Sequence, residues 1–396
     1  MLCVNSTKNL FVKYDILTYF PLCRVNRGDC DEQKTTLVNN TLRMMISSQC
    51  IKRNLRIAFG LCTEVSLPEV AEKVKNFTST TKDEVYFLGI KEVEKILNYV
   101  CNGVDIDATD TKNDVTVYVT LKEIYELSQE DSIKSLSKPK SIKKSSKKKK
   151  EDDNDAENTT TENVEENSSK KKKSWIEFLS VKKKHNVVMD LFGAMYASNP
   201  DVNVESAIEV APAISIDEVK PTEDYFTAVS SNKNRKGSLH LNSRILCSGF
   251  MHFHVKLDLG DLVKKGYTKE ELIWIVKTLT EALYFLQFKS GQSGTAHHSI
   301  PSLFNVSFSS NVMYLPNYSG LFYRPVNACT DHIKDIDEIV EDIQKKIKLS
   351  VDSINRMVDT LCKESLAKVW YHPLSVDFNE YKEIENHLSS CLDTII

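Results

Sequence analysis

A block of charged residues near the middle of the chain sets the strongest limit on how this sequence can fold. Segment 132–150 contains nine lysines and no acidic residue, and segment 151–169 contains eight acidic residues and no basic one. Four lysines follow at 170–173. Because so few large apolar residues are present, burial cannot offset the entropy lost on ordering. We therefore expect 132–173 to be disordered and to mark the clearest boundary in the chain.

The composition predicts a soluble, cytoplasmic protein. Its ten cysteines show no Cys-x-x-Cys spacing, which is typical of reduced thiols and not of a disulfide framework or a zinc ribbon. Neither a secretory leader nor an apolar run of membrane-spanning length is found in the sequence, so no membrane partner is expected. The formal net charge is only −3. A nucleic-acid site would therefore need a local concentration of positive charge.

Two such concentrations exist. Segment 24–56 carries seven basic and three acidic residues, and segment 220–256 carries six basic and two acidic residues.

The first concentration ends in a helix with two different faces. Apolar residues at helical spacing form one face: Ile51, Leu55, Ala58 and Phe59. Basic residues occupy another: Lys52, Arg53 and Arg56. Ser47, Ser48 and Gln49 stand at the start, where free backbone N–H groups can bind phosphate. The alternative is an ordinary surface helix whose basic face is solvated.

The second concentration predicts a long β-hairpin arm. A strand at 225–229 leads into a polar, basic tip at 230–238, and the chain returns at 239–241. Alternating residues over 250–255 predict a further strand with both faces occupied. The alternative for the tip is a disordered basic loop.

Other segments give clear helix and strand signals. Apolar spacing predicts helices around 93–100 and 121–127, and a capping box at 268–271 opens a strong helix that continues to about 283. A strand is expected at 304–308, and a helix is expected from 331 to about 366.

The order of motifs in the first concentration identifies a family resemblance. The motifs are Asn26-Arg27-Gly28-Asp29, Gln33-Lys34, Asn39-Asn40, Arg43, Ser47-Ser48-Gln49 and Lys52-Arg53. Together they resemble the N-terminal signature of the CasC family, the backbone subunit of the type I-E CRISPR Cascade complex. Asn39-Asn40 stands where the family has a Gly-Gly turn, and Asn tolerates the left-handed turn geometry.

The second concentration resembles the thumb of the same family. The matching phrases are Tyr225-Phe226-Thr227-Ala228-Val229 and Gly237-Ser238-Leu239-His240-Leu241. Segments 206–215 and 248–253 resemble the strands that enter and leave the thumb, with Pro212 in place of a His, which suggests an edge or a bulge. Two departures concern RNA contacts. Ala194 replaces an Arg ahead of the retained Met195, and loop 290–298 lacks the basic residues of the family.

The resemblance implies an α+β fold. Its parts are an RRM- or ferredoxin-like palm, an inserted helical finger domain and a β-hairpin thumb. The expected boundaries are 1–60, 187–216 and 248–328 for the palm, 61–186 for the fingers with the insert 132–173, 217–247 for the thumb, and 329–396 for a C-terminal helical region.

The resemblance also implies a non-catalytic function. Copies of the chain would polymerise along a CRISPR guide RNA, with the palm on phosphates and the thumb displacing bases at intervals, so that the guide can pair with target DNA in antiviral defence. The other partners would be the large, small and repeat-handle-capping Cascade subunits, and no cofactor or metal is expected. The residues predicted to bind RNA are Asn26, Arg27, Lys34, Arg43, Ser48, Gln49, Lys52, Arg53, Arg56, Met195, Lys233, Arg235, Lys236 and Leu241.

Two other functions fit the sequence. The first is a CRISPR-superfamily endoribonuclease that processes repeat RNA or cleaves target RNA, with candidate groups at Asp29, Asp31, His252, His254 and His297-His298. Against it, adjacent histidines on an extended segment point in opposite directions, and Asp29 matches an acidic position of the non-cleaving family. The second is a self-assembling scaffold that binds no RNA.

Overall fold

The computed structural model describes residues 9–28, 32–106, 116–129, 184–195, 203–229, 231, 237–288, 299–317, 336–361, 370–373 and 381–396. The charged segment 132–173 lies outside them. The chain divides into two compact units: the first combines Met1–Phe59 with Ala207–Ile396, and the second is Gly60–Ser206. Each unit is described by itself, and both contain helices and strands, as an α+β fold requires.

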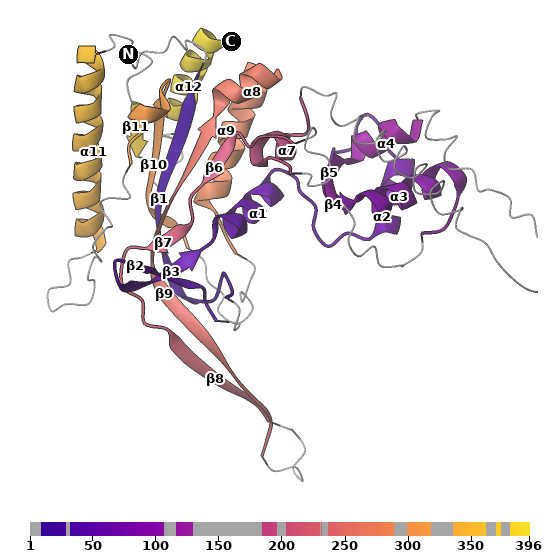
Figure 1. Ribbon diagram of the computed structural model, residues 1–396, viewed down its shortest axis with the longest axis horizontal. Helices are drawn as coiled ribbons and strands as arrows, with labels where there is room; N and C mark the ends of the chain where they lie inside the picture. Colours follow the sequence, from indigo (N-terminus) through magenta and orange to yellow (C-terminus); the bar gives the residue numbers. More distant parts are fainter. Residues whose placement is uncertain are drawn as a thin grey trace, which may run out of the picture. The chain divides into compact units, whose positions relative to one another are not determined.

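An antiparallel sheet forms the centre of the first unit (Figure 1). Its strand order is β11-β10-β1-β9-β7-β3-β2, and β6 and β8 also pair with β9. The strands are β1 (Phe11–Cys23), β2 (Thr35–Val38), β3 (Thr41–Ile46), β6 (Ile208–Val210), β7 (Ala213–Ser215), β8 (Thr222–Val229), β9 (Ser238–Asp258), β10 (Pro301–Ser309) and β11 (Trp370–Pro373).

Helices pack on both faces of this sheet. They are α1 (Ser48–Ala58), α8 (Leu259–Lys265), α9 (Lys269–Tyr284), α11 (Ile336–Leu361) and α12 (Tyr381–Ile395), with a short 3₁₀ helix at Val312–Tyr314. Tyr14 of β1 points to α9, where its hydroxyl lies 3.1 Å from Thr280 Oγ1. Leu17 points to the other face and packs with Ile343 and Ile347 of α11. This follows from the two-residue period of a strand, which sends odd and even positions to opposite faces.

Strand β9 connects the sheet to the hairpin arm. Its alternating residues Met251, Phe253 and Val255 are buried, as the sequence predicted. The predicted arm is present, because β8 pairs with the first half of β9 along its whole length. The sequence suggested separate strands at 239–241 and 250–255, whereas the structure has one strand of 21 residues. Pro212 separates β6 from β7, which both pair with β9, since proline has no N–H to donate.

Three further predictions for the first unit agree with the described residues. The Thr268 capping box begins α9, with the Thr268 N–H 2.9 Å from Glu271 Oε2. The strand expected at 304–308 lies within β10, and the long helix expected from 331 is described as α11 over Ile336–Leu361.

A two-residue turn joins β2 to β3. Asn39 and Asn40 have φ angles of 50° and 59°, and Val38 pairs with Thr41 on either side of them. Two successive left-handed residues define the turn that best fits the twist of a hairpin. The expectation that asparagine replaces glycine here without loss of the turn is confirmed.

The second unit is mixed. It contains α2 (Leu67–Lys75), β4 (Val85–Gly89), α3 (Ile90–Asn102), β5 (Thr116–Thr120), α4 (Leu121–Gln129) and α7 (Val187–Phe192). Helices α3 and α4 were predicted. The antiparallel pair β4–β5 was not, although its β-branched and aromatic residues favour strands. Residues 187–206 lie in this unit, whereas the sequence grouped 187–216 with the palm.

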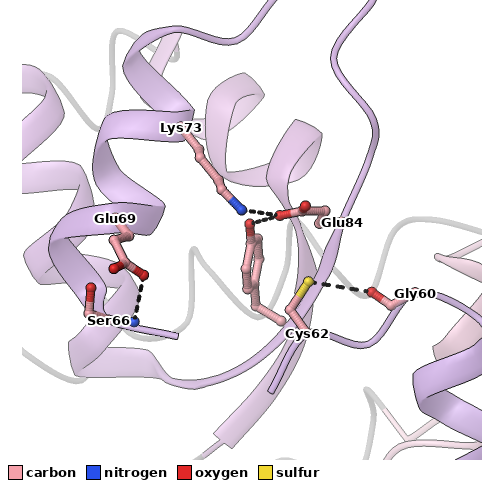
Figure 2. Close-up of polar contacts among 7 residues, drawn as sticks. Gly60, Cys62, Ser66, Glu69, Lys73 and Glu84 are labelled. Atoms are coloured by element: carbon pink, nitrogen blue, oxygen red, sulfur yellow. Dashed lines mark hydrogen bonds and ion pairs between the residues drawn. The ribbon is translucent and has the colours of Figure 1, made fainter. Parts of the chain in front are cut away.

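A small polar cluster joins α2 to β4 (Figure 2). Lys73 Nζ lies 2.7 Å from Glu84 Oε2, and the Tyr86 hydroxyl donates to the same oxygen at 2.6 Å. These two contacts lower the pKa of the Glu84 carboxyl. Cys62 Sγ and the carbonyl of Gly60 are 3.8 Å apart beside it. The cluster therefore fixes how the helix meets the strand.

Among the described residues, none of the helices has the length and apolar character needed to cross a membrane.

We predict that Asn40→Val lowers the stability of the first unit by about 1–2 kcal/mol, because a β-branched residue is strained at a positive φ. Asn40→Gly is the matched control, since glycine adopts this geometry without strain. Chemical denaturation of the two variants measures the difference. Equal midpoints for the Val and Gly variants would contradict the turn geometry.

Candidate nucleic-acid interface

Two segments, 24–28 and 32–34, lie beside the start of α1 and are held together by one buried side chain. Gln33 is 1% exposed. Its Oε1 accepts the N–H of Val25 at 2.9 Å and the N–H of Asn26 at 3.3 Å. Its Nε2 donates to the carbonyls of Lys34 at 3.1 Å and Met45 at 3.0 Å. Arg27 of the first segment is exposed and pairs with Gln33 in an isolated β-bridge.

Asn26 connects segment 24–28 to the start of α1. Its Oδ1 accepts the N–H of Ser47 at 2.7 Å. Ser47 is the N-cap residue, and its Oγ accepts the N–H of Cys50 at 3.4 Å. The backbone N–H groups of Ser48 and Gln49 have no hydrogen-bond partner among the described residues. The helix start is thus held in place while two of its donors remain available for an anion.

Three predicted basic residues follow on α1. Arg53 is exposed, whereas Lys52 and Arg56 are half-buried, and Arg56 Nε donates to the Lys52 carbonyl at 3.2 Å. Burial lowers the pKa of Lys52, the charge of Arg56 lowers it further, and Glu209 opposes both effects. An anion placed beside Lys52 would relieve the repulsion between the two cations.

The opposite face of α1 anchors the helix in the core. Ile51, Leu55 and Phe59 are buried as predicted, and the Phe59 ring lies 5.8 Å from that of Trp274 on α9. Ala58, which was expected on the same face, is exposed.

Arg43 does not contact solvent, and its predicted role in RNA binding is wrong. It is 1% exposed, and its Nη1 donates to the Ser215 carbonyl at 2.9 Å. Burial lowers the pKa of the guanidinium, while Asp217 and Glu218 partly oppose this. Arg43 therefore ties β3 to β7. Arg43 and Met44 are both buried although neighbouring residues of a strand face opposite ways, so β3 is covered on both faces.

The two faces of the hairpin arm carry different side chains. The register pairs Thr227 with Leu241 and Glu223 with Ile245, so these residues share a face with Tyr225. Tyr225 is 65% exposed and Leu241 is 66% exposed. The arm therefore presents an aromatic ring and a branched aliphatic side chain to solvent on one side.

The other face of the arm is held by a contact among three side chains. The Arg244 guanidinium lies 4.8 Å from the centre of the Phe226 ring, and its Nε lies 3.3 Å from Asp224 Oδ2. The sequence had not singled out these residues, although a cross-strand cation–aromatic pair can be found once the register is known.

The predicted RNA-binding residues are thus only partly brought together. The first unit holds Asn26, Arg27, Lys34, Ser48, Gln49, Lys52, Arg53, Arg56 and Leu241. Met195 is 85% exposed in the second unit, after Ala194, which pairs with Val204. Lys233, Arg235 and Lys236 lie outside the described residues, as do Asp29, Asp31, His297 and His298.

The histidines of the alternative, enzymatic hypothesis lie elsewhere in the first unit. Asp15 Oδ1 is 2.9 Å from Lys13 Nζ and 3.7 Å from Nε2 of the buried His252. His254, whose pKa is lowered by burial and by Lys13, lines a cavity of about 380 Å³.

The cations of this cavity already contact carboxylates. Besides the Lys13–Asp15 pair, Lys256 Nζ lies 2.7 Å from Glu209 Oε2. Among the described residues, His, Cys, Asp and Glu do not gather into any group of three or more that could hold a metal.

The fold and the site together define an α+β protein with an open helix start beside basic residues and a β-hairpin arm. A family model described as CT1975-like protein, a Cas family, matches residues 12–365. The chain therefore belongs to the CT1975-like family of Cas proteins.

Solved structures share this fold. A chain described as "CRISPR RNA-guided surveillance complex, pre-nicking" is similar with a TM-score of 0.63 at 16% identity, covering 96% of this chain and 99% of that one. A chain of a "CRISPR RNA-guided surveillance complex" is similar with a TM-score of 0.51 at 13% identity and the same coverage. A search of curated proteins finds no match.

Proposed function

We propose that this protein is a non-catalytic backbone subunit of a type I-E Cascade complex, which polymerises along a CRISPR guide RNA. One observation carries the proposal: an open helix start, followed by the exposed Arg53 and the half-buried Lys52 and Arg56, lies in the same unit as a hairpin that exposes Tyr225 and Leu241 on one face. Family membership and the described surveillance-complex chains support the proposal.

The chain order and sheet order of the first unit support an RRM-like palm. Strand β1, helix α1, strands β6/β7 and β9, helix α9 and strand β10 follow one another along the chain. In the sheet they are ordered β10-β1-β9-β7. This is the order of a ferredoxin-like βαββαβ unit, with the first and third strands in the centre. The second unit takes the place of the fingers, and the β8–β9 arm that of the thumb.

The palm would hold the RNA backbone. Two free N–H groups at the start of α1, with Lys52, Arg53 and Arg56 on the following turns, match a phosphate in charge and hydrogen-bonding capacity. Arg27 and Lys34 add charge from the neighbouring segments. None of these groups reads a base edge, so the grip is independent of guide sequence.

The thumb would act on the bases. Leu241 and Tyr225 offer apolar surface that can replace the stacking partner of a base, with Leu241 as a wedge and Tyr225 as a stacking platform. Bases between successive thumbs would stay ordered and pair with target DNA. Further copies of the chain and the other Cascade subunits would be the protein partners, in the cytoplasm.

Catalysis is not part of the proposal. The Lys13–Asp15 and Lys256–Glu209 contacts neutralise the cations around His254, so a scissile phosphate gains little from the cavity.

Lys52→Ala is expected to weaken binding to single-stranded RNA and to reduce the slope of log affinity against log salt by about 0.7–1, because one phosphate contact is lost. The effect should be the same for unrelated RNA sequences. Lys277→Ala, on the exposed surface of α9, is the matched control and should leave the slope unchanged. A Lys52→Ala slope equal to that of the control would remove Lys52 from the phosphate site.

Repeat RNA and complementary target RNA are expected to remain intact when incubated with the purified protein, with or without magnesium. Gel electrophoresis of end-labelled RNA measures this. Cleavage at a defined position that is lost in His254→Ala would contradict the non-catalytic role.

A further inference from the structure

The buried Gln33 side chain joins three separate segments of backbone. A glutamine amide has two donor hydrogens and an oxygen with two acceptor sites. Here the oxygen accepts hydrogen bonds from the N–H groups of Val25 and Asn26, and the nitrogen donates to the carbonyls of Lys34 and Met45. All four positions of the amide are occupied by backbone groups, so one side chain fixes segments 24–28 and 32–34 against β3.

This arrangement also sets the position of the helix start. The Asn26 backbone, held by Gln33, carries the side chain that accepts the Ser47 N–H at 2.7 Å. Met45, also held by Gln33, lies two residues before Ser47 in the chain. The Asn26 side chain and the segment from Met45 to Ser47 both position the open end of α1, and both are held by the Gln33 amide.

Gln33 reaches the hairpin as well. Its backbone N–H donates to the Ile245 carbonyl at 3.3 Å. Ile245 pairs with Glu223 of β8, while Cys247, two residues on, pairs with Cys23 of β1. Ile245 thus lies where β9 passes from the sheet into the arm. Its hydrogen bond with Gln33 joins segment 32–34 to the base of that arm.

We propose that Gln33 is a positioning residue that couples the phosphate-binding start of α1 to the β8–β9 arm. A phosphate seated at α1 then fixes where Leu241 meets the RNA, and each contact strengthens the other. The inference rests on the proposed function, since it assumes that both elements bind the same RNA.

A purely structural role makes a different prediction. Removing the amide takes one partner from each of four buried or half-buried backbone groups, of which the Lys34 carbonyl still accepts the Met45 N–H at 2.9 Å. The loss lowers stability whatever the protein binds. Coupling between palm and arm is a separate quantity, which a double-mutant cycle measures independently of overall stability.

The experiment compares this cycle in three backgrounds of the full-length chain. Lys52→Ala, Leu241→Ala and the double variant are prepared with native Gln33 and with Gln33→Met, which keeps the length of the side chain and removes its hydrogen bonds. Affinity for a fluorescein-labelled single-stranded RNA is measured at one salt concentration. Gln344→Met on α11 is the matched control background, and Gln33→Asn, which keeps an amide but shortens the side chain by one methylene, replaces Gln33→Met if the latter does not fold.

With native Gln33, and in the Gln344→Met background, the fold-loss of RNA affinity in the double variant is expected to differ from the product of the two single-variant fold-losses by about threefold or more. In Gln33→Met the losses are expected to multiply. If the affinity losses depart from a simple product by the same factor with native Gln33 and with Gln33→Met, Gln33 does not couple the two elements. The proposed function is then unaffected. If neither single variant weakens binding in the native background, both the coupling and the proposed function are wrong.

Discussion

The pairing of β9 with its neighbours is the constraint on which the rest of the first unit depends. This strand of 21 residues pairs with β1, β6 and β7 in the sheet and with β8 in the arm. The buried residues Met251, Phe253 and Val255 fix which face of β9 points to the core. Because a shift of one residue would reverse every side chain, the core also determines which face of the arm carries Leu241. The packing of Met251, Phe253 and Val255 in the sheet therefore determines which face of the arm exposes Leu241 and Tyr225.

The cations of this protein have two different uses, and their sign alone does not distinguish them. Arg43 and Lys13 are buried and bind carbonyl or carboxylate oxygens within the fold. Arg53 and Arg27 are exposed. The formal net charge of −3 hides this division. What marks the candidate interface is the combination of exposed cations with a helix start whose cap is complete and whose next two N–H groups are open.

The sequence was most informative where one local rule dominates. The Ser47 cap, the buried Ile51 and Leu55, the Thr268 capping box and the Asn39-Asn40 turn each follow from the chemistry of a few adjacent residues. The existence of the arm followed from the strand–tip–strand pattern.

The sequence did not predict the features that depend on contacts between residues far apart in the chain. Arg43 lies among residues that read as a basic strand, and only the approach of Ser215, 172 residues away, buries it. Gln33 was noticed as part of a motif, but its four backbone contacts could not be inferred without the fold of segments 24–28 and 32–34. The β4–β5 pair was missed because two five-residue strands lie next to strong helices. The Lys13–Asp15 pair beside His252 was missed because β1 and β9 are far apart in the chain.

The central claim is that this protein holds a guide RNA along an array of its own copies. The most direct measurement is the nucleic acid that co-purifies with the full-length chain from cells containing a CRISPR locus. The account predicts small RNAs of uniform length, protected from added nuclease over the stretch covered by protein. Filaments that persist after nuclease treatment, with no absorbance from nucleic acid, would contradict it.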